Sequence, residues 1–111
     1  MKIKKSILYY DNGNIRDEWW HKEGDDGYYH REEGPAQIIY HKSGGISYEA
    51  WLVDDEEHRM DGPACIYYHK DGTIIAEEYY INGENLSKEE WADHPLRQEY
   101  LIKEAMKETL E

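Results

Sequence analysis

The sequence contains only one cysteine, Cys65, three prolines, no phenylalanine and no long apolar run. A single cysteine excludes an intramolecular disulfide, as is typical of proteins in a reducing compartment. The segment Met1–Tyr10 is too short and too polar for a secretory signal peptide, and no stretch has the length of a membrane-spanning helix. We therefore expect a cytoplasmic protein that neither depends on disulfides nor enters a membrane.

Basic residues are also scarce. Thirteen Lys and Arg stand against twenty-five Asp and Glu, which gives a net charge of −12. A protein this acidic is repelled by the nucleic-acid backbone and by anionic membrane surfaces. The only basic run is Lys2, Lys4 and Lys5, at the very start of the chain. The composition therefore argues against direct binding to nucleic acid or to a membrane.

A high charge and a mean hydropathy of −1.05 are typical of disordered chains. The aromatic content favours a folded protein instead, because eleven Tyr and four Trp can bury large areas. A length of 111 residues is that of one domain with a modest core. We expect residues 1–111 to form a single domain.

Two segments of the chain are nearly identical. Residues 30–44 align without a gap on residues 58–72, an offset of 28, and ten of the fifteen positions match. The shared pattern reads H-R-x-x-G-P-A-x-I-x-Y-H-K-x-G. Beyond its last glycine the likeness continues with Ile46 and Ile74, Glu49 and Glu77, and Trp51 and Tyr79, and a degenerate earlier copy supplies Gly13, Ile15, Glu18 and Trp20. Self-similarity at a fixed period predicts a repeat architecture.

Each copy has the pattern of a β-hairpin. Asn12-Gly13, Ser43-Gly44 and Asp71-Gly72 are typical of tight turns that need positive φ. The flanking segments are rich in Ile, Tyr and Trp, as strands prefer. We predict strand–turn–strand units over 6–20, 36–52 and 64–81, joined by links such as 54–63. The expected fold is mainly β: a twisted antiparallel meander of tandem hairpins over 6–83, with a helical cap over 84–111.

The alternation of strand side chains suggests a division between two faces. Period two places the isoleucine two residues after the turn glycine on one face, and the glutamate and aromatic residue five and seven after it on the other. If the isoleucine face is buried, the acid–aromatic row is a candidate recognition surface. The alternatives are that Trp20, Trp51 and Tyr79 face the core, or that both faces are partly covered.

The C-terminal segment has a helical pattern. Ser87-Lys88-Glu89-Glu90 is a capping box that opens a short helix through Trp91, and Pro95 ends or kinks it. Residues 96–110 then have amphipathic spacing. We expect this helix to cover the end of the sheet and protect an edge strand; docking of a partner is the alternative.

The hairpin with Glu and an aromatic residue after its glycine resembles MORN-repeat variants, which occur in bacterial antitoxin-like proteins and in small phage and prophage proteins. The resemblance covers about residues 7–83 and departs from the plain repeat in the long links that carry His-Arg-x-x-Gly-Pro-Ala. It implies a scaffold that binds, commonly to a protein, without chemistry of its own.

The pattern does not favour catalysis. Six histidines lack the short Cys/His spacings of a zinc site, and no phosphate loop or nucleophile motif occurs. We expect no metal, no cofactor and no catalytic residue. Arg31 and Arg59 have two interpretations: they grip an anionic ligand, or they pair with neighbouring acids inside the links. Their recurrence favours a structural link, formed by His30, Arg31, Gly34, Pro35, His58, Arg59, Gly62 and Pro63.

The leading functional hypothesis is a non-enzymatic acidic binding protein. Residues 6–83 carry seventeen acids and six bases, and such a surface suits an inhibitor, antitoxin-like or anti-defence protein that occupies a basic, nucleic-acid-binding surface of a nuclease, toxin or defence effector. The alternatives are a nucleotide-like small-molecule binder or sponge, and a structural repeat that self-assembles. The expected partner-binding residues are Asp25, Asp26, Asp54, Asp55, Glu56, Glu57, Glu49, Trp20, Trp51 and Tyr79.

Overall fold

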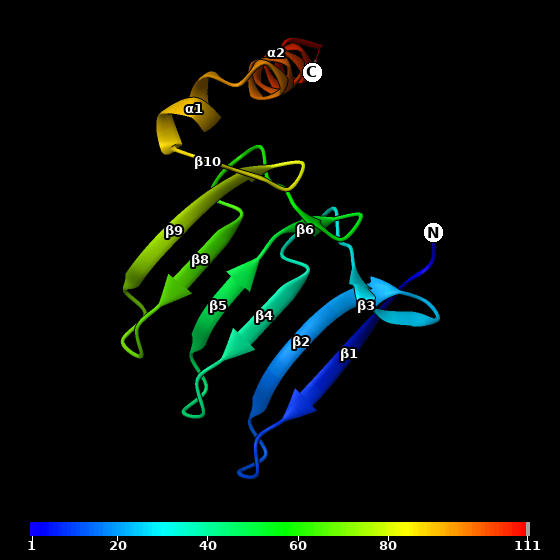
Figure 1. The fold of residues 1–111 in the computed structure, drawn as a ribbon, viewed down its shortest axis with the longest axis vertical. Coiled ribbons are helices and arrows are strands. Elements are labelled where there is room, and N and C mark those ends of the chain that lie inside the picture. Colours follow the sequence, from blue (N-terminus) through cyan, green and yellow to red (C-terminus); the bar gives the residue numbers. More distant parts are fainter. Residues whose placement is uncertain (111) are drawn as a thin grey trace.

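The structure is a computed structural model that describes residues 1–110. It is mainly an open antiparallel sheet with two helices at the C-terminal end (Figure 1). The strands are β1 (Ile3–Tyr9), β2 (Ile15–Lys22), β3 (Asp25–Tyr29), β4 (Gln37–Tyr40), β5 (Ile46–Ala50), β6 (Leu52–Val53), β7 (Glu56–Glu57), β8 (Cys65–Tyr68), β9 (Ile74–Ile81) and β10 (Glu84–Leu86), and the helices are α1 (Lys88–Asp93) and α2 (Pro95–Leu110).

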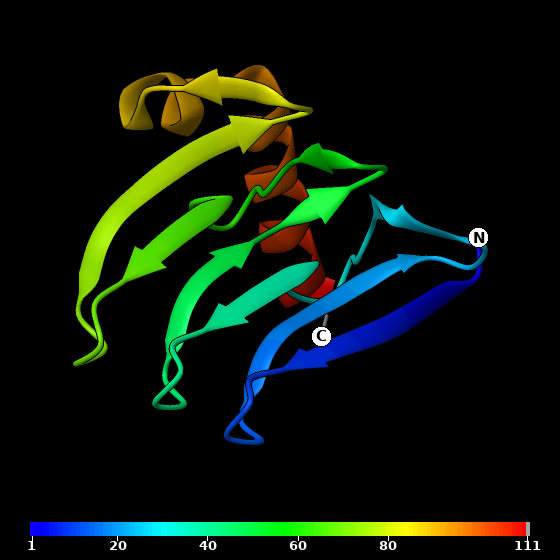
Figure 2. The same ribbon diagram turned by 60° about the horizontal axis from the view of Figure 1, so that its bottom comes forward.

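Three long hairpins, β1–β2, β4–β5 and β8–β9, lie side by side in chain order (Figure 1). The strand order is β1-β2-β4-β5-β8-β9-β10, with β3 also paired to β2 and with β6–β7 as a separate pair. The predicted antiparallel β class and C-terminal helix are confirmed. Both helices lie at the end of the molecule opposite the three tight turns (Figure 1), and Figure 2 shows the three tight turns together at one end of the sheet.

The three tight turns have the same geometry. Backbone N–H groups of Tyr10, His41 and His69 each donate across the turn, at 2.8, 2.7 and 2.8 Å. Gly13, Gly44 and Gly72 have φ values of 88°, 112° and 89°. A side chain is strained at such angles, so the predicted positive-φ role of these glycines is confirmed.

A β-bulge in each long hairpin changes which residues share a face. Tyr40 pairs with Ile46, whereas Ile38 pairs with Glu49. Because Ile38 and Tyr40 are two apart on one strand they face the same side, and so do their partners Ile46 and Glu49. The predicted separation of the isoleucines from the acid–aromatic row was therefore wrong. Assigning side chains to faces by strict alternation fails at a β-bulge, because the extra residue moves the side chains that follow it to the opposite face.

The core of the sheet is thin and built from small residues. Its buried members are Ala36, Ala50, Leu52 and Cys65, and half-buried Tyr29, Tyr48, Tyr67 and Tyr80 pack against them. Tyr48 lies opposite Tyr67, with ring centroids 4.8 Å apart. The other face, called the isoleucine face, carries Ile38, Ile46 and Ile66 together with Glu18, Glu49 and Glu77. Both faces are thus only partly covered, which is one of the alternatives that the sequence left open.

Tyrosine–glutamate hydrogen bonds join neighbouring hairpins on the isoleucine face. The Tyr40 hydroxyl donates to Glu18, and the Tyr68 hydroxyl donates to Glu49 at 2.5 Å. Burial, and then the bond to Glu49, raise the pKa of Tyr68 to about 12, so the hydroxyl remains a donor. Lys5 also lies 2.9 Å from Glu18, which is only 8% exposed. The two tyrosine–glutamate bonds fix the strand register between neighbouring hairpins.

Helix α1 packs on the β9–β10 end of the sheet, whereas α2 packs mainly on α1 and leaves Leu101, Ile102 and Met106 exposed. The expectation that residues 96–110 cover the end of the sheet and protect an edge strand was therefore wrong, and residues 84–86 of the predicted cap form β10.

The predicted capping box at Ser87 and Glu90 and the predicted break at Pro95 are confirmed, and Pro95 is the first residue of α2. Trp91 is buried against Tyr79 at 4.9 Å and donates its indole N–H to Arg59 O at 2.9 Å. Along residues 1–110 no helix is long and apolar enough to cross a membrane.

Glu18→Gln is expected to lower the unfolding free energy at neutral pH by about 1–3 kcal/mol, because the ion pair with Lys5 is lost. Burial alone would raise the pKa of Glu18, but the bonds from Tyr40 and Lys5 bring it below the ordinary value of 4.5. A carboxyl group whose pKa is lower in the folded than in the unfolded protein stabilises the fold at pH values above its unfolded pKa. This stability is lost as the pH falls through the folded pKa.

Urea unfolding across the range from about pH 7 to about pH 3 measures this effect. The gap between wild type and Glu18→Gln should shrink as the pH falls. Glu33→Gln, at an exposed carboxylate, is the matched control and should follow the wild type. A gap that is constant with pH would contradict the assignment.

Candidate partner-binding surface

Each long hairpin is followed by a short second hairpin that sequence reasoning missed. Lys22 pairs with Asp25, Val53 with Glu56 and Ile81 with Glu84, and each pair encloses a two-residue turn. The turns Asp54-Asp55 and Asn82-Gly83 have positive φ at both residues, as a type I′ turn requires. Asp54-Asp55 lacks glycine and was therefore assigned to a link. The Asn-Gly pair 28 residues later was the available clue.

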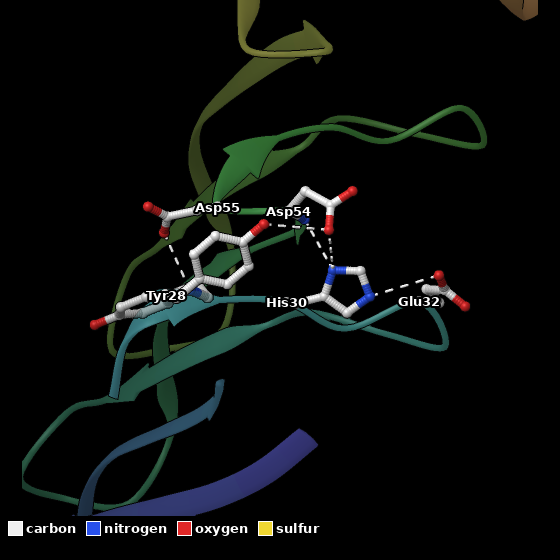
Figure 3. Close-up of polar contacts among 6 residues, drawn as sticks. Tyr28, His30, Glu32, Asp54 and Asp55 are labelled. Atoms are coloured by element: carbon white, nitrogen blue, oxygen red, sulfur yellow. Dashed lines mark hydrogen bonds and ion pairs between the residues drawn. The ribbon is translucent and has the colours of Figure 1, made fainter. Parts of the chain in front are cut away.

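These short hairpins bring together acids from two separate parts of the chain. The Tyr28 hydroxyl donates to Asp54 at 3.3 Å, and the Tyr29 N–H donates to the Asp55 carboxylate at 3.0 Å. The Asp55 N–H donates back to Tyr29 O at 2.8 Å. Figure 3 shows β3 lying beside the β6–β7 turn through these contacts. We call the resulting patch the acidic surface: Asp25, Asp26, Asp54, Asp55, Glu56 and Glu57.

The acidic surface carries more negative charge than the nearby cations balance. All of its members except Glu57 are exposed. Among residues 1–110, no Lys or Arg forms an ion pair with any of the six. Lys22 pairs with Asp25 in the β2–β3 register and lies 5.7 Å from the Tyr28 ring, and His30 lies 3.4 Å from Asp54. Partial desolvation, followed by the charges of Asp54, Asp55 and Glu56, raises the pKa of Tyr28. The carboxylates therefore create an unbalanced field at this edge.

His30 holds the β6–β7 turn in place. Its side chain is buried, with 8% of the residue exposed, and its Nδ1 accepts the Asp54 N–H at 2.8 Å (Figure 3). This role places the proton on Nε2, which lies 3.5 Å from Glu32. His58 makes the equivalent contact, since its Nδ1 accepts the Asn82 N–H at 3.0 Å. The link histidines thus position the turn of the following hairpin.

Burial of His58 lowers the pKa of its imidazole, and the nearby Glu56 charge opposes this only partly. A neutral ring is the form that can accept the Asn82 N–H. The His58 ring is therefore suited to a structural role at neutral pH.

The link arginines stack on the predicted recognition tryptophans. The Arg31 guanidinium lies 3.8 Å from the Trp20 ring centroid and donates to Pro35 O at 3.1 Å. At Gly34 a Cβ atom would lie only 3.1 Å from the guanidinium carbon, so the glycine makes room for it. One face of Trp20 is therefore covered from within the chain.

Arg59 repeats the same arrangement. It lies 3.7 Å from the Trp51 ring, donates to Pro63 O at 3.0 Å and forms a 2.9 Å ion pair with Asp61. The predicted pairing with link acids holds for Arg59, whereas Arg31 forms no carboxylate ion pair within residues 1–110. These contacts give structural roles to the histidine, arginine and glycine of His-Arg-x-x-Gly-Pro-Ala and to the carbonyl of its proline.

The other expected binding residues are engaged differently. Glu49 accepts the Tyr68 hydroxyl, and Tyr79 packs against Trp91. They lie on or above the isoleucine face, apart from the exposed turns. Of the ten predicted partner-binding residues, the six acids lie on β3 and the β6–β7 hairpin, which contact each other, and the other four make internal contacts.

Two open grooves border the links. One, of about 570 Å³, is lined by Trp20, His30, Arg31 and Glu32 among others, and the second, of about 280 Å³, by Trp51, His58, Arg59 and Tyr100 among others. In the described part of the chain, no three His, Cys, Asp or Glu side chains are grouped to hold a metal ion. The links and turns therefore expose charged groups and hydrogen-bond acceptors.

No protein-family model, curated protein or solved structure matches the chain.

Arg59→Lys is expected to destabilise the fold by about 1–3 kcal/mol, because lysine cannot reproduce the planar stack on Trp51 and the bond to Pro63 O together. Urea unfolding monitored by tryptophan fluorescence measures it. Arg16→Lys, at an exposed arginine of β2, is the matched control and should remain within a few tenths of a kcal/mol of the wild type. Equal stability of all three proteins would favour the ligand-gripping interpretation of Arg59.

Proposed function

We propose that the chain is a non-enzymatic binding protein that uses its acidic surface to occupy a basic surface of a partner protein. The observation that carries this proposal is that β3 and the β6–β7 hairpin, which together carry six carboxylates, lie side by side through Tyr28 and Tyr29, and that no Lys or Arg within residues 1–110 forms an ion pair with these carboxylates. Carboxylates held only for solubility have no need to be gathered from segments more than twenty residues apart.

The scaffold supports this proposal because it fixes the carboxylates before binding. Asp54 and Asp55 form a turn whose backbone is held by His30 and Tyr29 at 2.8 Å each. A preorganised charge pattern loses little conformational entropy when it binds. The same field accelerates encounter with a basic partner.

The proposal includes a tandem-repeat origin for this scaffold. Positions 28 residues apart make the same contacts: His30 and His58 accept a turn N–H, Arg31 and Arg59 stack on Trp, and Tyr40 and Tyr68 donate to Glu. Such a pattern is what tandem duplication of a hairpin unit predicts. The molecule then consists of a repeated scaffold with a binding edge.

The partner class follows from the charge. A row of fixed carboxylates resembles a row of phosphates, so a protein surface evolved for nucleic acid is a suitable target. A nuclease, a toxin or a defence effector has such a surface, and the chain would act as its inhibitor. A nucleotide-like small ligand is less well supported, because Arg31 and Arg59 are already engaged with tryptophan rings and proline carbonyls.

Asp54→Asn/Asp55→Asn should weaken binding to the partner about tenfold or more, and should reduce the dependence of affinity on salt. Asparagine tolerates positive φ, and Asn82 occupies the matching turn position, so the turn should be preserved. The partner is first isolated from the host by affinity capture. Its affinity for the purified chain is then measured by calorimetry over a range of salt concentrations.

The control removes the same charge elsewhere. Asp11→Asn/Glu108→Gln alters the β1–β2 turn and α2, away from the acidic surface. Affinity should then stay within a factor of two or three of the wild type. Equal weakening by both double variants would reduce the effect to net charge. Affinity that is indifferent to salt and to Asp54 and Asp55 would overturn the proposal.

A further inference from the structure

We infer that copies of this chain associate head to tail, with β1 of one copy adding to the free edge of β9 in another. The inference rests on unused contacts at the two ends of the sheet and does not depend on the proposed function.

The two internal junctions between long hairpins follow one rule. Where β4 joins β2, Ile38 lies opposite Glu18, and where β8 joins β5, Ile66 lies opposite Glu49. Each junction has only three residue pairs. In both, the tyrosine two residues after the isoleucine donates its hydroxyl to that glutamate.

A second hydrogen bond completes each junction near the tight turn. The Tyr10 hydroxyl donates to Tyr40 O at 2.5 Å, and His41 Nε2 lies 3.1 Å from Tyr68 O. A junction therefore needs a glutamate and a turn-side donor on one hairpin, and Ile-x-Tyr on the strand that is added to it.

The free edge of β9 offers the first half of such a junction. β10 pairs only with Tyr79–Ile81, so β9 is open from Ile74 to Glu78. Glu77 occupies the position of Glu18 and Glu49, and His69 that of His41. Both side chains are exposed and make no hydrogen bond or ion pair within residues 1–110. The neighbouring Ile74 and Ile75 are 51% and 56% exposed.

β1 carries the second half. Ile7-Leu8-Tyr9 has the Ile-x-Tyr pattern, and Ile7 lies opposite Glu18 in its own hairpin just as Ile38 lies opposite Glu49. Tyr9 is 59% exposed, and its hydroxyl has no hydrogen-bond partner among residues 1–110.

The backbone of β1 is oriented to accept the added strand. The Trp20 N–H points towards β4, where it donates to Ala36 O at 2.8 Å. Glu18, two residues earlier, points the same way, so the facing residue Ile7 directs its N–H and C=O away from β2. The groups of Ile7 thus lie on the open edge of the sheet.

The donors and acceptors of the two edges select the head-to-tail arrangement. The open edge of β1 presents the Tyr9 hydroxyl as a donor, whereas that of β9 presents the Glu77 carboxylate as an acceptor. Pairing β1 with β1 leaves the hydroxyl without a carboxylate, and pairing β9 with β9 sets glutamate near glutamate at a cost. Pairing β1 with β9 joins donor to acceptor and forms a heterologous interface, which leads to rings or open chains.

The added junction is short. If β1 of the incoming copy takes the register of the two internal junctions, Ile7 lies opposite Glu77, Leu8 opposite Ala76 and Ser6 opposite Glu78. β10 covers the next part of β9, so residues 1–5 of the incoming copy pass outside it and contribute no pairing. Three residue pairs suffice at each internal junction, but between separate molecules they give weak association. We expect it to appear between micromolar and millimolar concentrations.

Sedimentation velocity of the full chain over that range tests the inference. The wild type should gain mass with concentration. Ile7→Pro and Glu77→Pro each remove an outward N–H without breaking the hairpin that contains it, so each variant alone should remain monomeric. An equimolar mixture should form a dimer and nothing larger, because only one compatible pair of edges remains.

Tyr9→Phe tests the side-chain contact without altering the backbone. Loss of its bond to Glu77 should lower the association constant about fivefold. Tyr100→Phe in α2 is the matched control and should associate like the wild type, and thermal unfolding confirms that each variant is folded. A wild type that remains monomeric at millimolar concentration, or a Glu77→Pro variant that dimerises alone, overturns the inference.

Discussion

The stacking of a link arginine on the tryptophan near the end of the preceding long hairpin is the contact on which the sheet depends. The sheet has a core of alanine, cysteine and leucine, too small to hold strands together by burial alone. Arg31 and Arg59 add a planar cation that covers a large ring, satisfies a proline carbonyl and requires glycine three residues later. Stacking, hydrogen bonding and close backbone approach are thus combined in a seven-residue link.

The same contact explains how a chain with mean hydropathy −1.05 folds. Aromatic rings and the aliphatic parts of long charged side chains bury apolar area that hydropathy scales do not credit. Tyr40 and Tyr68 extend this logic, since each buries a ring and gives its hydroxyl to a glutamate of the neighbouring hairpin. Polar side chains here perform the work that branched aliphatic residues perform in thicker sheets.

The features that the sequence predicted correctly are those decided by local chemistry. Gly13, Gly44 and Gly72 determine the tight turns, and Ser87 with Glu90 determines the start of α1, because each depends on residues a few positions apart. The long hairpins and the C-terminal helices followed from them.

The features it failed to predict depend on partners distant in the chain. The bulge opposite Tyr40 places Ile46 and Glu49 on one face, although their spacing is odd. The Asp54-Asp55 turn adopts positive φ without glycine because His30 and Tyr29, more than twenty residues away, hold its backbone. The gathering of the acids at one edge followed from that missed hairpin.

Comparison of residues at equivalent positions distinguishes those that stabilise the fold from those that can serve a specific function. Residues that match at an offset of 28, such as His30 and His58 or Arg31 and Arg59, make matching contacts and are accounted for by folding. The turns differ: Asp54-Asp55 in one short hairpin corresponds to Asn82-Gly83 in the next, with the same backbone geometry. Because asparagine and glycine already satisfy that geometry, the backbone of the turn does not require two carboxylates. Asp54 and Asp55 instead accept hydrogen bonds from Tyr28 and Tyr29 and add negative charge to the turn. A specific activity is best sought where equivalent hairpins differ in this way.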